Sequence, residues 1–272
     1  MSQKKVLFIA QEIYPYLPET QISLTARQLP QAVQERGHEI RTFMPKYGNI
    51  NERRNQLHEV IRLSGMNLII DDTDYSLLIK VASIQPARMQ VYFIDNEEFF
   101  QRKGTVVDKS GKEYADNDER SIFFVRGVME TVKKLRWIPD IIHCHGWMTA
   151  LAPLYIKKGY ADDPCFMNSK VIYSVYNNGF TKPFRPNFLN KLKFDAIGDK
   201  EIEALAKRGT FDFNTLTKLA IDYSDGIIQG SEEISDEIKN YITDKKIKFL
   251  GYEEDFDKNV EAIESFYEKI DQ

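Results

Sequence analysis

Apolar runs and helical repeats alternate along most of this chain. Residues 6–10 form an uninterrupted apolar run, which is typical of a parallel strand covered on both faces. Residues 21–36 repeat apolar side chains at helical spacing and end before Gly37, although Pro30 is expected to kink or restart this helix. Residues 39–44 form the next predicted strand and complete a right-handed βαβ unit.

The same two patterns continue to the C-terminus. Asp116 and Ser231 are the expected N-caps of two of the helices. Short alternating runs between residues 58 and 95 predict an antiparallel or mixed edge of the sheet. The predicted edge strands are residues 59–63, 75–81 and 89–94; the further strands are 138–143, 171–175 and 226–229; the further helices are 117–135, 148–158, 214–223, 232–241 and 252–270.

This order of elements predicts an α/β fold with a single doubly wound, Rossmann-like domain and a mostly parallel sheet. We expect the domain to cover residues 1–245, and residues 246–272 to form a C-terminal helical tail packed on it. The 272 residues are 42% hydrophobic, which is sufficient for a large core.

Charge and cysteine usage narrow the possible partners and the location. The formal net charge of -4 gives no broad positive field for nucleic acid or for an anionic membrane. Cys144 and Cys165 have no metal-binding or redox spacing and are expected to be reduced thiols. No signal peptide or membrane-spanning run is recognised, so we expect a cytoplasmic protein.

Residues 139–155 carry the strongest functional signal. An apolar run ends in His143 and His145, Trp147 follows, and a helical pattern comes next. Such a segment presents polar side chains at the carboxyl edge of a parallel sheet, where doubly wound folds bind ligands. The sequence contains no dinucleotide-binding glycine motif, P-loop, zinc-protease motif or nucleophile elbow. Spacing alone therefore predicts only an α/β ligand-binding domain.

Four segments in the expected order resemble the N-terminal half of bacterial glycogen and starch synthases. They lie at residues 5–15, at Leu29-Pro30 with residues 36–40, at residues 143–155, and at residues 219–225; residues 92–95 and 114–117 also fit in order. The resemblance covers roughly residues 4 to 240. It implies one half of a two-domain GT-B glycosyltransferase fold, from a family of retaining enzymes that transfer glucose from ADP-glucose to α-1,4-glucan without a metal or other cofactor.

The resemblance also implies an active site in the cleft between two domains, of which the second supplies most of the cations that bind the donor. We expect this chain to stop before such a domain. Where the family has a Lys-x-Gly-Gly-x-x-Asp loop, this chain has residues 18–24, with Pro18 and Glu19 removing an ammonium group and adding a carboxylate. In the His-Asp-Trp-His segment of the family, the Asp and the second His are replaced by Gly146 and Met148.

Five residues match positions of the family that bind substrate: Glu12, His145, Trp147, Tyr176 and Asn177. Tyr176 replaces a histidine that contacts the transferred sugar, and its phenol keeps one hydrogen-bond donor. Each residue also has a structural interpretation. Glu12 is equally suited to cap backbone N–H groups, His145 and Trp147 to packing, and Asn177 to a turn. His143 is expected to be a hydrogen-bonded core residue. No catalytic residue, cofactor site or metal site is predicted.

These observations leave three alternative functions. The first is a glycogen synthase relative that does not transfer glucose alone and binds α-glucan, or a protein partner, in glycogen metabolism. The second is an active ADP-glucose-dependent glucosyltransferase, formed as a homodimer or with a separate C-terminal domain. The third is a regulatory or interaction module that has no sugar site.

Overall fold

The computed structural model describes residues 3–271 and contains one sheet of ten strands. The strand order is β10-β9-β8-β7-β1-β2-β6-β5-β3, and β4 pairs with β5 outside this path. Every pairing from β10 through to β6 is parallel, while β3, β4 and β5 pair antiparallel at one edge. The predicted mostly parallel α/β fold and its antiparallel edge are therefore confirmed. The strands are β1 (Lys5–Ala10), β2 (Glu39–Pro45), β3 (His58–Glu59), β4 (Met66–Ile70), β5 (Thr73–Ile84), β6 (Met89–Asp95), β7 (Ile141–His145), β8 (Lys170–Val175), β9 (Gly226–Gln229) and β10 (Lys248–Leu250).

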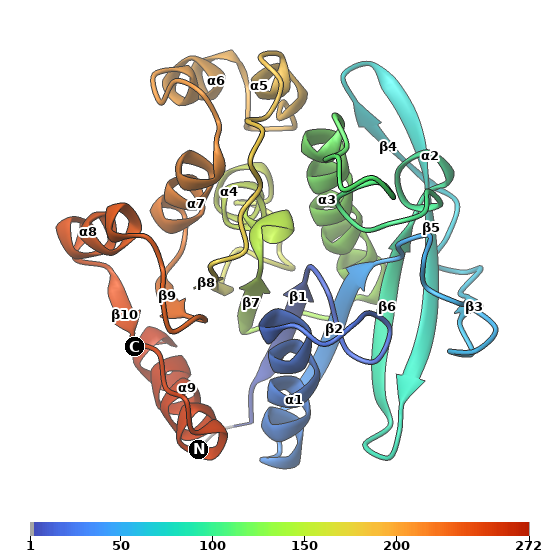
Figure 1. Ribbon diagram of the computed structural model, residues 1–272, viewed down its shortest axis with the longest axis vertical. Helices are drawn as coiled ribbons and strands as arrows, with labels where there is room; N and C mark the ends of the chain where they lie inside the picture. Colours follow the sequence, from blue (N-terminus) through green and yellow to red (C-terminus); the bar gives the residue numbers. More distant parts are fainter. Residues whose placement is uncertain (1–2, 272) are drawn as a thin grey trace.

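Helices cover both faces of this sheet (Figure 1). From β1, the strand order runs toward β2 and β6 on one side and toward β7, β8 and β9 on the other. Helix α1 connects strands in the first direction, whereas α3, α4 and α7 connect strands in the second. Because such crossovers are right-handed, α3, α4 and α7 lie on the face opposite α1. The C-terminal helix α9 contacts α1 and β10. The helices are α1 (Gln21–Glu35), α2 (Glu97–Phe100), α3 (Asn117–Leu135), α4 (Ala152–Leu154), α5 (Phe188–Lys191), α6 (Asp199–Ala206), α7 (Phe213–Asp222), α8 (Asp236–Lys245) and α9 (Phe256–Asp271).

Helix α1 begins at a capping box. The Thr20 hydroxyl accepts a hydrogen bond from the backbone N–H of Ser23, and the Ser23 hydroxyl accepts one from the N–H of Thr20. This pair satisfies two of the backbone donors that a helix start leaves free. Pro30 lies inside the helix without ending it, so the predicted restart of the helix is wrong.

The predicted boundaries of α8 and of the first edge strand are wrong, because capping and pairing, rather than hydrophobic period, decide where elements begin. The helix predicted at 232–241 is α8, four residues later, and its cap is Ser235, whose hydroxyl accepts from the N–H of Ile238. Asp116 does occupy the cap position of α3 but makes no capping bond there. Of the strand predicted at 59–63, only His58 and Glu59 pair with β5.

Two other segments differ from the prediction, one in its bounds and one in its type. The strand predicted at 138–143 is β7, which begins at Ile141 and reaches His145. The helix predicted at 148–158 consists of a 3₁₀ turn (Trp147–Thr149), the short α4 and a π-helical turn (Tyr155–Gly159). Strand β10 was not predicted, because three residues carry too little pattern to be recognised.

Helix α9 is attached to the sheet by a buried hydrogen bond. The hydroxyl of Tyr267 lies 2.7 Å from Nδ1 of His143 in β7, and Nε2 of the same ring lies 2.7 Å from the Ser174 hydroxyl in β8. Both ring nitrogens of His143 are therefore paired, which confirms the prediction of a hydrogen-bonded core histidine. Ion pairs of Glu264 with Arg36 and of Lys4 with Asp271 hold the outer side of the helix.

Among the described residues 3–271, no helix combines the length and the hydropathy that crossing a bilayer demands.

We predict that Tyr267→Phe lowers the free energy of unfolding by about 1–3 kcal/mol, because it leaves a buried nitrogen of His143 without a partner. Urea denaturation followed by circular dichroism measures the change. Tyr223→Phe is the matched control, since the Tyr223 hydroxyl makes no hydrogen bond within the described part of the chain and is half-buried. Equal stability of the two variants would contradict the anchoring role of Tyr267.

Candidate functional site

The carboxyl ends of four neighbouring strands bring the predicted site residues to one edge of the sheet. Ala10 of β1 is in register with His145 of β7, and His145 is in register with Ser174 of β8. Val175 of β8 is in register with Gln229 of β9. The residues that follow these strands, Glu12, Tyr176 and Ser231 among them, therefore surround one region.

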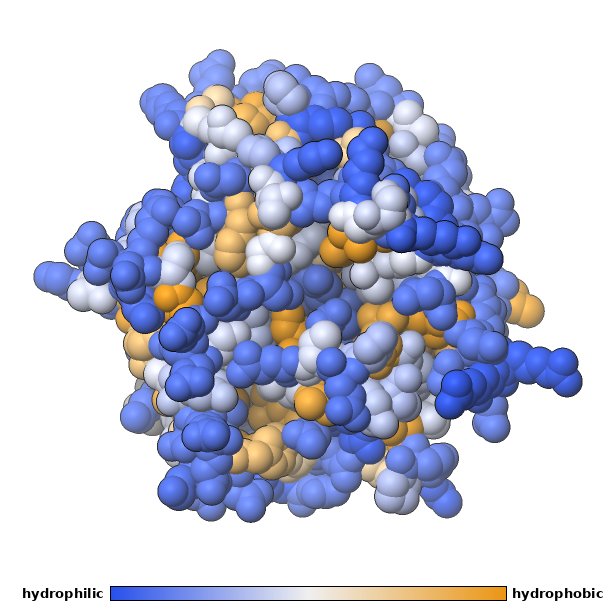
Figure 2. All heavy atoms as spheres, in the orientation of Figure 1, coloured by the Kyte–Doolittle hydropathy of each residue, from blue (hydrophilic) through white to orange (hydrophobic). Residues whose placement is uncertain are grey.

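A cavity of about 490 Å³ opens at this edge, and we call it the edge cavity. Most of its walls carry hydroxyl, amide or carboxylate groups. Figure 2 shows the face seen in Figure 1, where hydrophilic side chains predominate and apolar patches lie between them. The residues that line the cavity are Glu12, Thr20, Gln21, Ile22, Tyr176, Asn177, Asn178, Ser231, Glu232, Glu233 and Tyr252.

Glu12 lies in the wall of the edge cavity and is held by a side-chain hydroxyl rather than by the backbone N–H groups that the structural interpretation expected. Its carboxylate accepts a hydrogen bond from the Thr20 hydroxyl, which fixes the loop before α1, and it lines the edge cavity. Burial raises the pKa of Glu12, and the hydrogen bond from Thr20 opposes that rise. A half-buried carboxylate with remaining lone pairs is suited to accepting hydrogen bonds from ligand hydroxyls.

Tyr176 lies between the edge cavity and the buried His145. Its hydroxyl is 2.9 Å from Nδ1 of His145. The Tyr176 ring packs against Gly230, where an added Cβ would approach ring carbons to 2.6 Å, so only glycine fits at that position. Burial lowers the pKa of His145 to about 3, so this imidazole is neutral at physiological pH.

Asn177 and Asn178 follow Tyr176 along the wall of the cavity. The backbone N–H of Asn177 donates to the Ser231 hydroxyl at 3.0 Å, which joins the ends of β8 and β9. The side-chain oxygen of Asn178 is buried and has no hydrogen-bond partner within the described residues. These two amides therefore offer donors and acceptors to a ligand in the cavity.

Trp147 lies apart from the other four predicted residues. It is 2% exposed, and its indole packs edge-on against Phe180 at 4.9 Å and against Phe184 at 6.1 Å. These contacts agree with the packing interpretation of Trp147, and its contact with substrate stays a prediction. The chain turns away after Gly146, whose φ of +88° favours glycine and where a Cβ would meet Gln11 at 2.9 Å.

The electrostatic character of the edge cavity is negative. Three glutamates, Glu12, Glu232 and Glu233, line it, and no lysine or arginine is among the described lining residues. The start of α1, which in the resembling family follows a lysine- and glycine-containing loop, is capped by its own Thr20 and Ser23. A diphosphate in this cavity would meet carboxylates without a neutralising cation.

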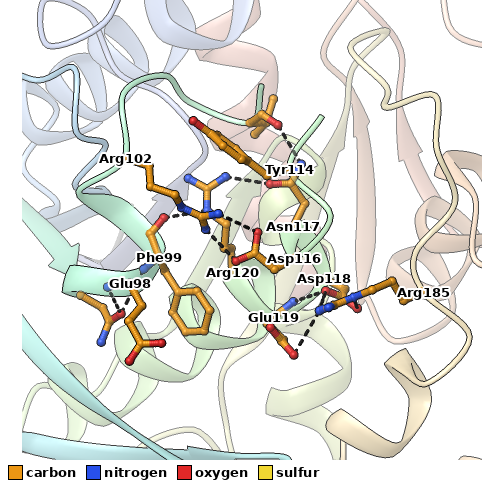
Figure 3. A network of polar contacts seen from close by, with 12 residues as sticks. Glu98, Phe99, Arg102, Tyr114, Asp116, Asn117, Asp118, Glu119, Arg120 and Arg185 are labelled. Carbon is orange, nitrogen blue, oxygen red and sulfur yellow. Dashed lines mark hydrogen bonds and ion pairs between the residues drawn. The ribbon is translucent and has the colours of Figure 1, made fainter. Parts of the chain in front are cut away.

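Cations elsewhere along this edge are engaged by acidic residues at the start of α3 (Figure 3). Arg102 forms a two-point contact with Asp116, and Arg185 forms one with Asp118. Arg120 is fully buried and donates to the carbonyl of Phe99 at 2.8 Å. These guanidinium groups hold the surrounding loops in place through bidentate and charge-assisted bonds.

Sequence reasoning missed Thr20 and Tyr252 as lining residues. The pattern Thr20-x-x-Ser23 before an apolar helix is a capping signal that could have placed Thr20 at a helix start. Tyr252 reaches the cavity through the return of the chain after β10, and its hydroxyl lies 3.5 Å from the amide nitrogen of Gln21. No local pattern around Tyr252 indicates that contact.

The described residues contain no group of three or more His, Cys, Asp or Glu side chains arranged to hold a metal ion.

Comparison with known proteins gives a consistent result. The family model of the starch synthase catalytic domain matches residues 5–250. The glycogen synthase of Chlorobium limicola is 35% identical over 235 residues, which cover 86% of this chain and 47% of that protein. The glycogen synthase of Chlorobaculum tepidum is 41% identical over 174 residues, covering 64% of this chain and 36% of that protein.

The fold also resembles a solved structure, the catalytic domain of starch synthase IV from Arabidopsis thaliana bound to ADP and acarbose. The TM-score is 0.75 at 19% identity, and the match covers 92% of this chain and 51% of that one. The chain spans about half the length of the curated relatives it matches. These matches agree with the resemblance seen in residues 5–15 and 143–155. The chain belongs to the starch synthase catalytic domain family, and it corresponds to the N-terminal half of the glycogen synthases.

Proposed function

We propose that the edge cavity binds a neutral segment of α-glucan and that residues 1–272 do not transfer glucose from a nucleotide sugar on their own. The observation that supports this most directly is the lining of the cavity, which combines hydroxyl, phenol and amide groups with three glutamates. Sugar hydroxyls both donate and accept hydrogen bonds, so such a lining matches a glucan.

Substrates of related proteins support the same class of ligand. The starch synthase IV structure holds ADP and acarbose. We infer that a binding site of this family has one part for the nucleotide and one part for the sugar. In this chain we assign the part that binds sugar to Glu12, Tyr176 and Asn177. His145 supports the Tyr176 hydroxyl from behind, and we assign it to positioning. Trp147 was predicted as a fifth contact, and its buried place leaves it a packing role in this proposal.

The phosphate part of such a site lacks its cations here. Glu232 and Glu233 raise the negative potential of the cavity, and Glu19 adds another carboxylate in the loop before α1. Transfer of glucose leaves negative charge on the departing diphosphate, so a catalytic site must offer positive groups to it. An active glucosyltransferase would need these groups from a homodimer or from another protein, which is the second candidate function.

The proposal also covers the cellular location of the protein and its domain organisation. Cys144 and Cys165 are both free and buried, which supports the reducing environment of a cytoplasm. We propose residues 1–245 as the main domain and residues 246–272 as a tail packed on it. The tail adds β10 to the sheet, Tyr252 to the edge cavity and α9 beside α1.

Incubation of the 272-residue chain with radiolabelled ADP-glucose or UDP-glucose and a glycogen primer is expected to give no incorporation above the blank. The reason is the missing positive charge around the diphosphate. A full-length bacterial glycogen synthase under the same conditions is the positive control. Clear turnover by the purified chain would remove the proposal that it cannot transfer glucose.

We expect Asn177→Ala to weaken binding of maltotriose about tenfold, the effect of losing roughly 1.4 kcal/mol of hydrogen bonding. Isothermal titration calorimetry measures the affinity. Asn190→Ala is the matched control, because Asn190 is exposed in α5 and lies outside the edge cavity. If the wild-type chain shows no saturable binding of maltotriose, a regulatory module without a sugar site becomes the better description.

The double substitution Glu232→Lys with Glu233→Lys should tighten ADP binding by at least about tenfold at low salt, because it reverses two charges in the edge cavity. Maltotriose, which carries no charge, should respond much less. The double substitution Glu97→Lys with Glu203→Lys, at exposed positions in α2 and α6 outside the edge cavity, makes the same change in net charge and is the control. Raising the salt concentration should reduce the gain. An unchanged ADP affinity in low salt would show that charge does not limit nucleotide binding.

A further inference from the structure

A second cavity, of about 190 Å³, lies between helices α1 and α9 above the ends of β7, β8 and β9. We call it the interhelix cavity. It shares Gln21, Tyr176 and Tyr252 with the edge cavity, so these residues separate the two. It is smaller than the roughly 300 Å³ at which sites for drug-sized ligands begin, so it suits one small ring and not a chain of sugars.

The floor of the interhelix cavity is polar, although it belongs to the centre of the sheet. His143, His145 and Ser174 line it and are each 2% exposed or less. His143 is fully paired, as described above. His145 is paired only at Nδ1, and its Nε2 is buried without a hydrogen-bond partner in the described structure.

An unpaired nitrogen at this place indicates a missing partner. Buried polar atoms in folded proteins are hydrogen-bonded to protein, water or ligand in the large majority of cases. When the Tyr176 hydroxyl donates to Nδ1 of His145, that nitrogen acts as the acceptor. The single proton of the neutral His145 ring is then on Nε2. His145 then offers an N–H donor at the wall of the interhelix cavity.

Helices α1 and α9 also contribute polar side chains to the wall of the interhelix cavity. Gln21, Thr25 and Gln28 line it at the spacing of one face of α1, and Leu24 and Leu29 line it between them. The buried stripe of α1 is mainly apolar and packs on the sheet, while the exposed Gln21 and Gln28 and the half-buried Thr25 border the cavity from the flank of the helix. Asn259 of α9 adds a third amide from the other side.

The charge of the lining restricts the class of ligand. Glu253 and Glu254 lie in its wall, and the described lining residues include no lysine or arginine. Anions are therefore disfavoured. Neutral amides and hydroxyls can satisfy several ligand hydroxyls at once, while Ile228, Ile263 and Phe256 offer apolar surface to the face of a ring.

We propose that the interhelix cavity is a second binding site, which holds one neutral, hydroxyl-rich ring of monosaccharide size. His145 Nε2, the amides of Gln28 and Asn259 and the hydroxyl of Thr25 bind the ligand hydroxyls. The site is distinct from the edge cavity proposed for glucan, and it does not depend on glucan binding. Because Tyr176 borders both cavities, occupancy of one site changes the wall of the other.

D-Glucose is the probe that tests this site, with binding to the 272-residue chain measured by saturation-transfer NMR and calorimetry. The wild-type chain is expected to bind D-glucose saturably. Asn259→Leu removes an amide and fills part of the cavity, and it should weaken binding at least tenfold. Lys258→Leu, at the exposed neighbouring position, is the matched control and should bind like the wild type.

Variants of the two cavities separate this proposal from the proposal of a glucan site. Asn177→Ala lies in the edge cavity and should leave D-glucose binding unchanged, while Asn259→Leu should leave maltotriose binding unchanged. No saturable D-glucose binding by the wild-type chain would overturn the second site. Equal D-glucose affinity in Asn259→Leu and wild type would also overturn it, because the sugar would then bind elsewhere. Circular dichroism checks that each variant is folded.

Discussion

The need to pair two buried imidazoles at the end of β7 determines how the rest of the molecule is assembled. His143 and His145 lie in the middle of the sheet with ring centroids 4.0 Å apart. Burial holds the pKa of both well below its usual range, and their mutual repulsion when charged adds to this effect for His143. Both rings are therefore neutral, and each must find hydrogen-bond partners that do not require charge.

Those partners come from elements that are far apart in the sequence. Tyr267 of α9 and Ser174 of β8 serve His143, and Tyr176 beyond β8 serves His145. Helix α9 is thereby connected, through two adjacent imidazoles tilted by 35°, to Tyr176, which lines the edge cavity. The contact helps to explain why a charged, amphipathic C-terminal segment takes a defined place beside α1, since a buried phenol without a partner is costly. The partly buried ion pairs of Glu264 and Lys4 act in the same direction.

The sequence predicted the elements whose signal is local and missed those that depend on contacts between distant residues. A continuous apolar run located β1, because a parallel strand buried on both faces leaves no other pattern. Mainly apolar runs located β8 and β9, and the end of the first helix located β2. The start of α8 was placed four residues early because Ser231 and Ser235 are both plausible caps. In the fold Ser231 is already bonded to Asn177, a contact between residues 54 positions apart.

The candidate site shows the same division. Glu12, Tyr176 and Asn177 follow strand ends, so strand order and sequence position were enough to place them at the cavity. Trp147 also follows a strand end, yet the positive φ of Gly146 turns the chain and the indole packs beneath Phe180 and Phe184. Neither the backbone turn nor the two phenylalanines, more than 30 positions away, is indicated by the residues around Trp147.

Tyrosine at position 176 links the electrostatics of the site to its packing. The resembling family has a histidine there, and an imidazole can carry a proton toward an anionic ligand, whereas burial raises the pKa of the Tyr176 phenol further above neutrality. The phenol is also longer, so its hydroxyl reaches His145, and its ring takes the space that Gly230 leaves open. In the proposed function, this neutral side chain, supported by a neutral histidine in a cavity lined by glutamates, favours hydroxyl groups over phosphate. We infer that the replacement, which removes a potential cation, suits this edge of the sheet to an uncharged sugar.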